Sequence, residues 1–169
     1  MKKLKINLVH VVQSSNEYKA QGMETQNNAK LKIKGEDLHD LKIISACMQD
    51  AIFPATAMSY HADEKLFVIL ANRFMWEKEP IEHQESLMYH RVHSGLYFCH
   101  VEQIHHWNID QLDATDPLNL LAIHSDHPQE IHLVFSNQKQ IRLKIEKIKC
   151  YLKDLHEPWH TPQKPAHTF

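Results

Sequence analysis

Residues 131–155 read IHLVFSNQKQIRLKIEKIKCYLKDL, and this stretch decides the fold predicted for the whole chain. Ile, Leu and Phe occupy every second position over residues 131–135, and Ile, Leu and Ile do the same over residues 141–145. Ser-Asn-Gln-Lys lies between the two runs and favours a turn. The stretch therefore predicts a β-hairpin.

The apolar spacing changes to about 3.6 residues after Ile145. Ile148, Leu152 and Leu155 would share one side of a helix with Ile145, and the charged residues between them would occupy the other side. Burying these four apolar side chains would contribute about 1.5–3 kcal/mol each. We therefore expect a C-terminal helix that folds back and caps the sheet.

Another helix, the first along the chain, is predicted over residues 38–50. Asp37 is a suitable N-cap, and Asp40 can take the place of the Glu of a capping box. Strands are predicted over residues 31–33, 58–60, 66–74 and 118–123, with a long bent strand within 91–109 that carries a β-bulge after Phe98. Residues 77–90 are polar and irregular, which predicts a long exposed loop.

The order of these elements predicts one domain of the α+β class. Its core would be a curved antiparallel sheet or partly closed barrel with a C-terminal capping helix, as in pleckstrin-homology-like domains, plus one N-terminal helix. A flat α+β sandwich is the alternative. The domain would span residues 30–157, after a poorly ordered extension (1–29) and before an extended tail (158–169).

Composition excludes several classes of function. Nineteen Lys and Arg against 21 Asp and Glu give 19 − 21 = −2, so no overall field attracts nucleic acid or anionic membranes. No apolar run approaches the roughly 18 residues of a membrane span, and no Gly-rich phosphate loop is present. The three cysteines form no CxxC motif, and their odd number argues against a disulfide framework, which favours a cytoplasmic protein.

The 15 histidines raise the question of a metal site. His124 and His127, which flank a predicted turn, are the best pair of candidate ligands, although scattered surface histidines are the simpler interpretation. Ser125, Asp126 and His127 are contiguous and cannot form a catalytic triad, which needs groups from separate elements. No catalytic residue and no cofactor is predicted.

A candidate binding site lies where the central predicted strand ends, in the sequence Asn-Arg-Phe-Met-Trp-Glu. Arg73 follows an apolar run, so its guanidinium needs a carboxylate partner, for which Asp50 and Glu77 are candidates. Arg73, Trp76 and Arg91 are of the types enriched in binding hot spots. The competing interpretation is a structural ion pair covered by the tryptophan.

Several ordered motifs resemble one uncharacterised alphaproteobacterial family, the domain-of-unknown-function family numbered 2948. They are LHDLKIISACMQDA (38–51), NRFMWE (72–77), SGLYF (94–98), LLAI (120–123) and the stretch from LVF (133–135) through PW (158–159) to PAH (165–167). The resemblance covers residues 31–167 and implies a bacterial cytoplasmic protein, but no activity, cofactor or partner. Between residues 90 and 106 the chain has histidines where the family pattern leads us to expect arginines.

The sequence leaves two functions open. The first is a non-enzymatic cytoplasmic module that binds an unidentified protein partner or forms a homodimer. The alternative is an enzyme or metal-dependent protein with a pocket built from Arg73, Arg91 and histidines. An exposed apolar patch would favour the first, and titratable groups that converge in one pocket would favour the second.

Overall fold

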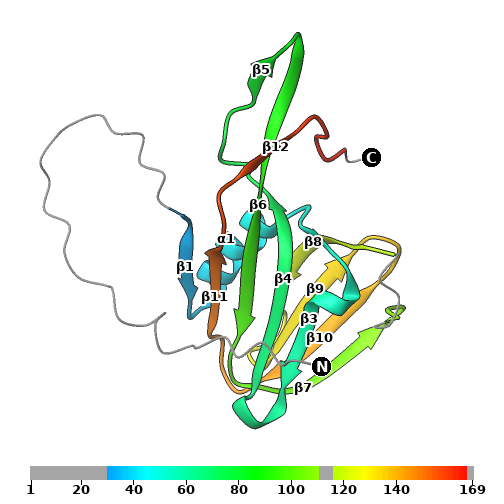
Figure 1. The fold of residues 1–169 in the computed structure, drawn as a ribbon. Coiled ribbons are helices and arrows are strands. Elements are labelled where there is room, and N and C mark those ends of the chain that lie inside the picture. Colours follow the sequence, from blue (N-terminus) through cyan, green and yellow to red (C-terminus); the bar gives the residue numbers. More distant parts are fainter. Residues whose placement is uncertain (1–29, 111–115, 167–169) are drawn as a thin grey trace, which may run out of the picture.

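Twelve antiparallel strands and one α-helix form the part of the chain that a computed structural model describes, residues 30–110 and 116–166 (Figure 1). The predicted extension over residues 1–29 lies outside these ranges. The helix is α1 (Leu38–Met48). The strands are β1 (Lys32–Gly35), β2 (Ile52–Phe53), β3 (Met58–His61), β4 (Leu66–Phe74), β5 (Ile81–His83), β6 (Ser86–Phe98), β7 (Val101–Trp107), β8 (Leu118–His124), β9 (Glu130–Phe135), β10 (Gln140–Ile145), β11 (Cys150–Asp154) and β12 (Trp159–Thr161).

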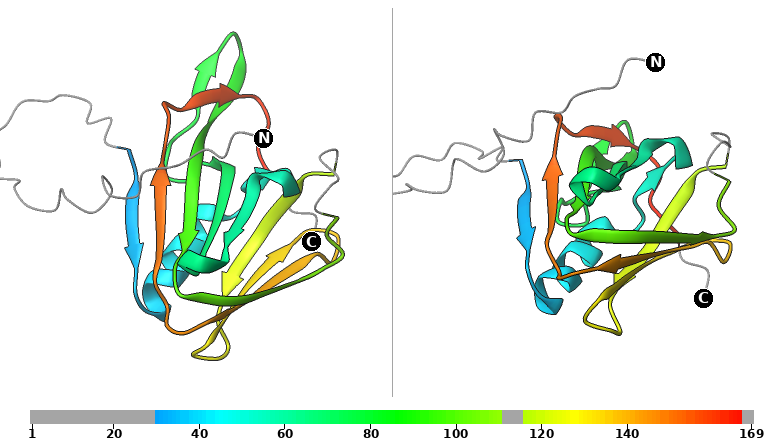
Figure 2. Two further views of the ribbon diagram at one scale, coloured as in Figure 1. Left: turned by 60° about the horizontal axis from the view of Figure 1, so that its bottom comes forward. Right: turned by 90° about the horizontal axis from the view of Figure 1, so that it is seen from below.

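The strands pair in the order β1-β11-β6-β4-β2-β8-β9-β10-β7 and form one open antiparallel sheet. β3 pairs with β4, and both β5 and β12 pair with β6. Figure 2 shows that the sheet bends, so that the β8-β9-β10-β7 part turns away from the β1-β11-β6-β4 part. Apolar side chains from both parts and from α1 meet on the inner face in a single core.

The predicted hairpin of residues 131–145 is confirmed as β9 and β10. Leu133 pairs with Ile141, Ile131 pairs with Leu143, and these side chains are buried in the core. Asn137 and Gln138 have φ values of 57° and 58°, the left-handed backbone that a two-residue hairpin turn needs to match the twist of the strands.

The predicted C-terminal helix is wrong, and with it the pleckstrin-like barrel that the helix was to cap. The chain forms β11 instead, which pairs with β1 on one side and with β6 on the other. Cys150, Leu152 and Asp154 alternate inward and are at most 2% exposed. Because Asp154 carries a charge, it conceals the strand alternation in the sequence. The fold is an open antiparallel sheet, and the one α-helix of the described residues lies near its N-terminal end.

The predicted first helix is confirmed as α1. The side chain of Asp37 accepts a hydrogen bond from the Asp40 backbone N–H at 2.8 Å, and the Asp40 carboxylate accepts one from the Glu36 N–H at 3.0 Å. Leu41, Ile44 and Met48 are the buried side chains of the helix, which packs on β8, β1 and β4. Among the described residues, no helix has the length and apolar character needed to cross a membrane.

The cap of α1 can be tested by replacement. Asp37→Ala is expected to lower the free energy of unfolding by about 1 kcal/mol, because one N–H group of the first turn loses its acceptor. Asp37→Asn keeps an acceptor oxygen and should cost only a few tenths of that amount. Urea denaturation measures both variants, and equal losses for Ala and Asn would contradict the capping role.

The predicted loop over residues 77–90 is also wrong. Residues 81–88 form a hairpin in which Ile81 pairs with Met88 and His83 pairs with Ser86, and this hairpin projects from the body of the domain (Figure 1). Gln84 and Glu85 form its turn with φ values of 48° and 63°, although neither is the Gly or Asn that such turns usually contain.

The long strand predicted within residues 91–109 divides into β6 and β7. The change of phase after Phe98 is present as a corner, where His100 has a φ of 58°. A β-bulge follows directly, because the pairing of β7 with β10 shifts by one residue between Val101 and Gln103. The Cys99 N–H donates to the Lys149 carbonyl at 2.8 Å, and the Glu146 N–H donates to the His100 carbonyl at 3.0 Å. These bonds hold the corner against the β10–β11 connection.

Candidate binding corner

Arg73 lies near the end of β4 with its side chain on the inner face of the sheet, and it is fully buried. Its Nε and Nη2 atoms each donate to a carboxylate oxygen of Asp154 at 2.8 Å. Its Nη1 and Nη2 atoms donate to Glu77 at 3.1 and 2.7 Å. The Ser94 hydroxyl also donates to Asp154, at 2.7 Å, so strands β4, β6 and β11 are joined by one polar network.

The charges of this network stabilise each other. Burial by itself raises the pKa of Asp154, but hydrogen bonds from Arg73 and Ser94 more than offset this and hold it below its ordinary value. Burial lowers the pKa of Arg73, but its hydrogen bonds to Asp154 and Glu77 raise it by more, so the pKa is higher than its ordinary value. Both groups are therefore ionised at neutral pH, and the guanidinium is enclosed by two carboxylates.

Trp76 and Arg91 fasten the chain just after α1. The Trp76 indole N–H donates to the Gln49 carbonyl at 3.1 Å. Arg91 Nη1 donates to the carbonyls of Asp50 and Asn72 at 3.2 and 3.1 Å. The structure thus brings Arg73, Trp76 and Arg91 to one end of β4, with Arg73 inside and the other two nearer the surface.

Aromatic rings surround this end of β4. The ring of Phe74 lies 4.5 Å from that of Trp76 and 5.8 Å from that of Tyr89, measured between centroids. The guanidinium carbon of Arg91 lies 5.4 Å from the centre of the Phe74 ring. We call these four residues the aromatic corner. Phe74 is buried, whereas Trp76 keeps 40% of its surface exposed.

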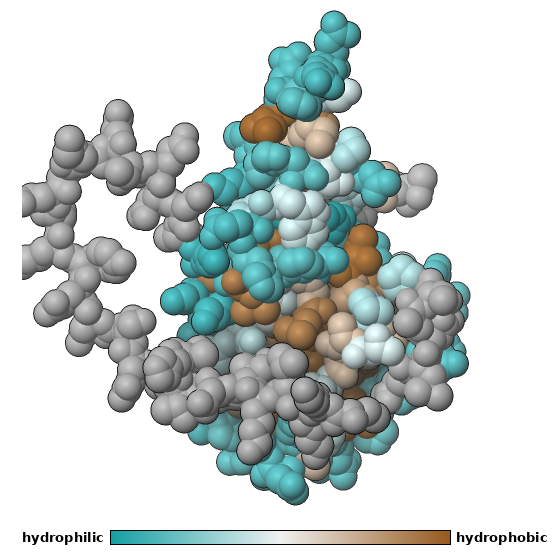
Figure 3. Space-filling view, in the orientation of Figure 1, coloured by the Kyte–Doolittle hydropathy of each residue, from teal (hydrophilic) through white to brown (hydrophobic). Residues whose placement is uncertain are grey.

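The β5–β6 hairpin extends the aromatic corner away from the domain. Ile81 is 41% exposed and Leu87 is 53% exposed, although both are large apolar side chains. Figure 3 shows apolar residues among hydrophilic ones at the base of this projection. Sequence reasoning missed Ile81 and Leu87, because it treated their segment as a loop.

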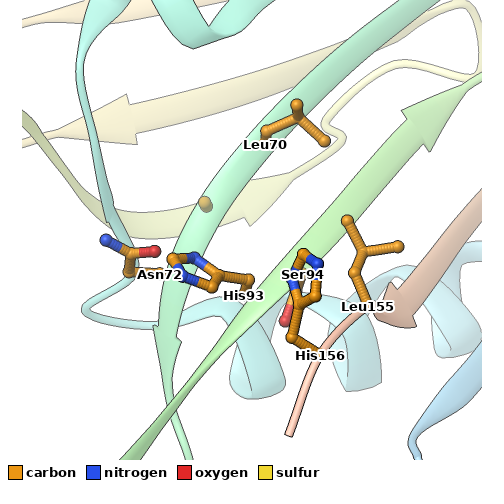
Figure 4. A pocket seen from close by; sticks show the side chains of 7 residues that line it. Leu70, Asn72, His93, Ser94, Leu155 and His156 are labelled. Carbon is orange, nitrogen blue, oxygen red and sulfur yellow. The ribbon is translucent and has the colours of Figure 1, made fainter. Parts of the chain in front are cut away.

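A shallow pocket of about 200 Å³ lies between β4, β6 and the end of β11 (Figure 4). The rings of His93 and His156 lie 5.4 Å apart there, and the Trp159 ring lies 4.6 Å from that of His93. The lining residues are Leu70, Ala71, Asn72, His93, Ser94, Leu155 and His156. These lining residues include neither Arg73 nor Arg91, the two arginines predicted for such a pocket, and they include no Asp or Glu.

The two predicted metal ligands, His124 and His127, make other contacts. The ring of His124 stacks on that of His132, with centroids 5.1 Å apart, and its Nδ1 lies 3.3 Å from Asp126. The carbonyl of His127 accepts a hydrogen bond from the Ser125 hydroxyl at 2.8 Å. Over residues 30–110 and 116–166, no three His, Cys, Asp or Glu side chains converge as metal ligands would.

The chain belongs to the family described as protein of unknown function (DUF2948), which matches residues 31–167. The match confirms the family that the sequence motifs resemble, and its function is unknown. No curated protein and no solved structure matches the chain.

Proposed function

We propose that this domain is a non-enzymatic protein-interaction module of the bacterial cytoplasm, which binds a partner protein through the aromatic corner and the β5–β6 hairpin. The observation that carries the proposal is the exposure of Leu87 on a projecting hairpin, on the same face of β6 as Tyr89 and Arg91 of the aromatic corner. Ile81 is also exposed, but it pairs with Met88 and so lies on the opposite face of the hairpin. An exposed large apolar side chain that continues a surface of aromatic rings is typical of an interaction site. Tryptophan and arginine are also the residue types that contribute most to binding energy.

The polar network beneath the corner supports binding rather than catalysis. A catalytic acid or base must be able to contact the substrate. Arg73 and Asp154 are buried, and their polar atoms form hydrogen bonds with each other, with Glu77 and with Ser94. The network holds β4, β6 and β11 in register, which keeps the aromatic corner rigid. A rigid surface loses little entropy when it binds.

The cysteines support the cytoplasmic part of the proposal. Cys47, Cys99 and Cys150 are all free thiols, and none lies in a disulfide. Free thiols are typical of reducing compartments.

Leu87→Ser tests the binding surface. Leu87 is the most exposed of these apolar side chains, so the change should leave the fold intact and weaken partner binding at least about tenfold. Leu121→Ser is the matched control, because Leu121 is another exposed leucine but lies on β8. The measurement is quantitative recovery of cross-linked proteins from native cytoplasm with each variant as bait.

A partner lost with Leu87→Ser and retained with Leu121→Ser would support the proposal. Equal recovery with both variants, or no protein recovered above background with the parent domain, would contradict it.

The alternative function, a metal-dependent protein or enzyme, has one observation in its favour. His93 and His156 come from separate segments, both line the pocket, and their rings meet edge to face with centroids 5.4 Å apart (Figure 4). Elemental analysis of protein purified from native cells tests it. A stoichiometric transition metal that is lost with His93→Ala would favour this alternative over the interaction module.

A further inference from the structure

The sheet has two terminal strands, β1 and β7, and they differ in how their outer edges are protected. Lys32 and Lys34 belong to β1, and Lys32 also pairs with Lys153 of β11. Lysines on a short edge strand oppose the addition of another strand, because the edge of a second molecule would bring like charges together. The β1 edge is therefore protected.

β7 has no such protection. Residues 103–107 read Gln-Ile-His-His-Trp, without lysine, proline or any fixed charge. β10 pairs with one side of β7, and within the described part of the chain no strand pairs with the other side. Among the described residues, β7 is held outside the sheet ladder at its start, where the Tyr60 hydroxyl donates to the carbonyls of Val101 and Glu102 at 2.9 and 3.1 Å and the Val101 N–H donates to the Lys65 carbonyl at 2.9 Å.

We propose that residues 103–107 of β7 pair antiparallel with the same residues of a second copy of this chain. A twofold axis at His105 places each Gln103 opposite Trp107 of the other copy and each Ile104 opposite its His106. Such an interface is self-complementary, as a twofold dimer requires. It joins the two open sheets into one and covers both unprotected edges at the same time.

Charge favours a second copy over a charged peptide as the occupant. The free part of β7 offers no fixed charge to anchor an acidic or basic strand, and two copies of it meet without repulsion. The outer face of β7 already contains stacked side chains, because the His105 ring lies 6.3 Å from that of Trp107 and Arg142 lies over the Trp107 ring at 5.3 Å. The Trp107 side chain, 44% exposed, would be covered by the partner strand.

His105→Glu tests the position of the axis. In the single chain the new carboxylate faces Arg142, its pairing neighbour on β10, so folding is not impaired. In the dimer the two carboxylates meet at the axis, because a residue on a twofold axis faces its own copy. His124→Glu is the control, since His124 is also exposed but lies on β8, which β9 and β10 separate from β7.

Sedimentation equilibrium of the full chain measures the effect. We expect a dimer for the parent, a dimer dissociation constant raised about fivefold or more by His105→Glu, and a change of less than about twofold for His124→Glu. A parent that is monomeric at every concentration would overturn the proposal. So would a parent dimer that His105→Glu does not weaken.

His105→Cys gives an independent check of the register. Directly opposed residues of an antiparallel pair have Cβ atoms about 4.5–5.5 Å apart, close enough for a disulfide to form with slight adjustment. Mild oxidation should therefore convert the variant into a covalent dimer on a non-reducing gel, whereas His124→Cys and the parent should stay uncross-linked. Cross-linking of His124→Cys to the same extent would show that collisions, not the proposed pairing, join the chains.

Discussion

Arg73→Met is expected to destabilise the folded domain by about 3–5 kcal/mol, because it leaves Asp154 as a buried carboxylate without its cation. Asp154 is 2% exposed and cannot regain the lost interaction from water. Glu77 contributes less to the loss, since its side chain is 46% exposed and can be hydrated. Urea denaturation at pH 7 measures the change in the free energy of unfolding.

The double variant Arg73→Met with Asp154→Leu separates the two possible causes of this loss. Replacing both charges by apolar side chains removes the unpaired carboxylate, so the double variant should be more stable than Arg73→Met alone. If the double variant were the less stable of the two, the loss would come from packing at Arg73 and not from an uncompensated charge.

The network also predicts a dependence on pH. The pKa of Asp154 is lower in the folded state than its ordinary value of 3.8, so its ionisation stabilises the fold above pH 3.8. This contribution is lost as the pH falls through the lower, folded-state pKa. When the pH is lowered from 7 to 3, the free energy of unfolding of the parent should therefore fall relative to that of the Arg73→Met, Asp154→Leu variant. A difference that did not change with pH would contradict the assignment.

The same aspartate explains the main error in predicting the fold from sequence. A half-buried strand is recognised by apolar residues at every second position. In β11 the inward positions are Cys150, Leu152 and Asp154, so one of three is charged, and the spacing of Ile148, Leu152 and Leu155 favoured a helix. The carboxylate is acceptable in the core only because the guanidinium of Arg73, which is distant in sequence, binds it. A local pattern contains no information about that partner.

The β9–β10 hairpin was predicted correctly because nothing of this kind interrupts it. Its inward positions are all apolar, and Asn137 tolerates the left-handed turn. The β5–β6 hairpin was missed for the opposite reason. Its turn uses Gln84 and Glu85, and its strands project from the core, so no buried face imposes alternation on the sequence.

The candidate site was anticipated in part. The sequence indicated that the Arg73 guanidinium needs a carboxylate and named Glu77, which does bind it, but it did not point to Asp154 or Ser94. Asp50 was the other candidate partner of Arg73. Its backbone carbonyl accepts a hydrogen bond from Arg91 instead. Aromatic residues such as Tyr89 join the corner only through the pairing of β6 with β4, a long-range contact that periodicity cannot predict.

Cys150→Asp is expected to unfold the domain. A helix with Ile148, Leu152 and Leu155 on its buried side would turn residue 150 toward solvent, whereas in β11 Cys150 is fully buried against Gly35. An aspartate there would be a buried charge with no cation beside it, at a cost of several kcal/mol, in a fold whose whole stability is about 5–15 kcal/mol. Circular dichroism and thermal melts measure the result.

Lys153→Asp is the matched control, because it introduces the same residue three positions along the strand on the outer face. Lys153 pairs with Lys32 there, so the exchange removes a like-charge contact and should change the free energy of unfolding by less than about 0.5 kcal/mol. Thiol labelling adds a test without substitution. Burial raises the pKa of the Cys150 thiol to about 12, so it should react far more slowly than the half-buried Cys47 and Cys99 until the domain unfolds. A folded Cys150→Asp variant, or rapid labelling of Cys150 in the native protein, would place this segment outside the sheet.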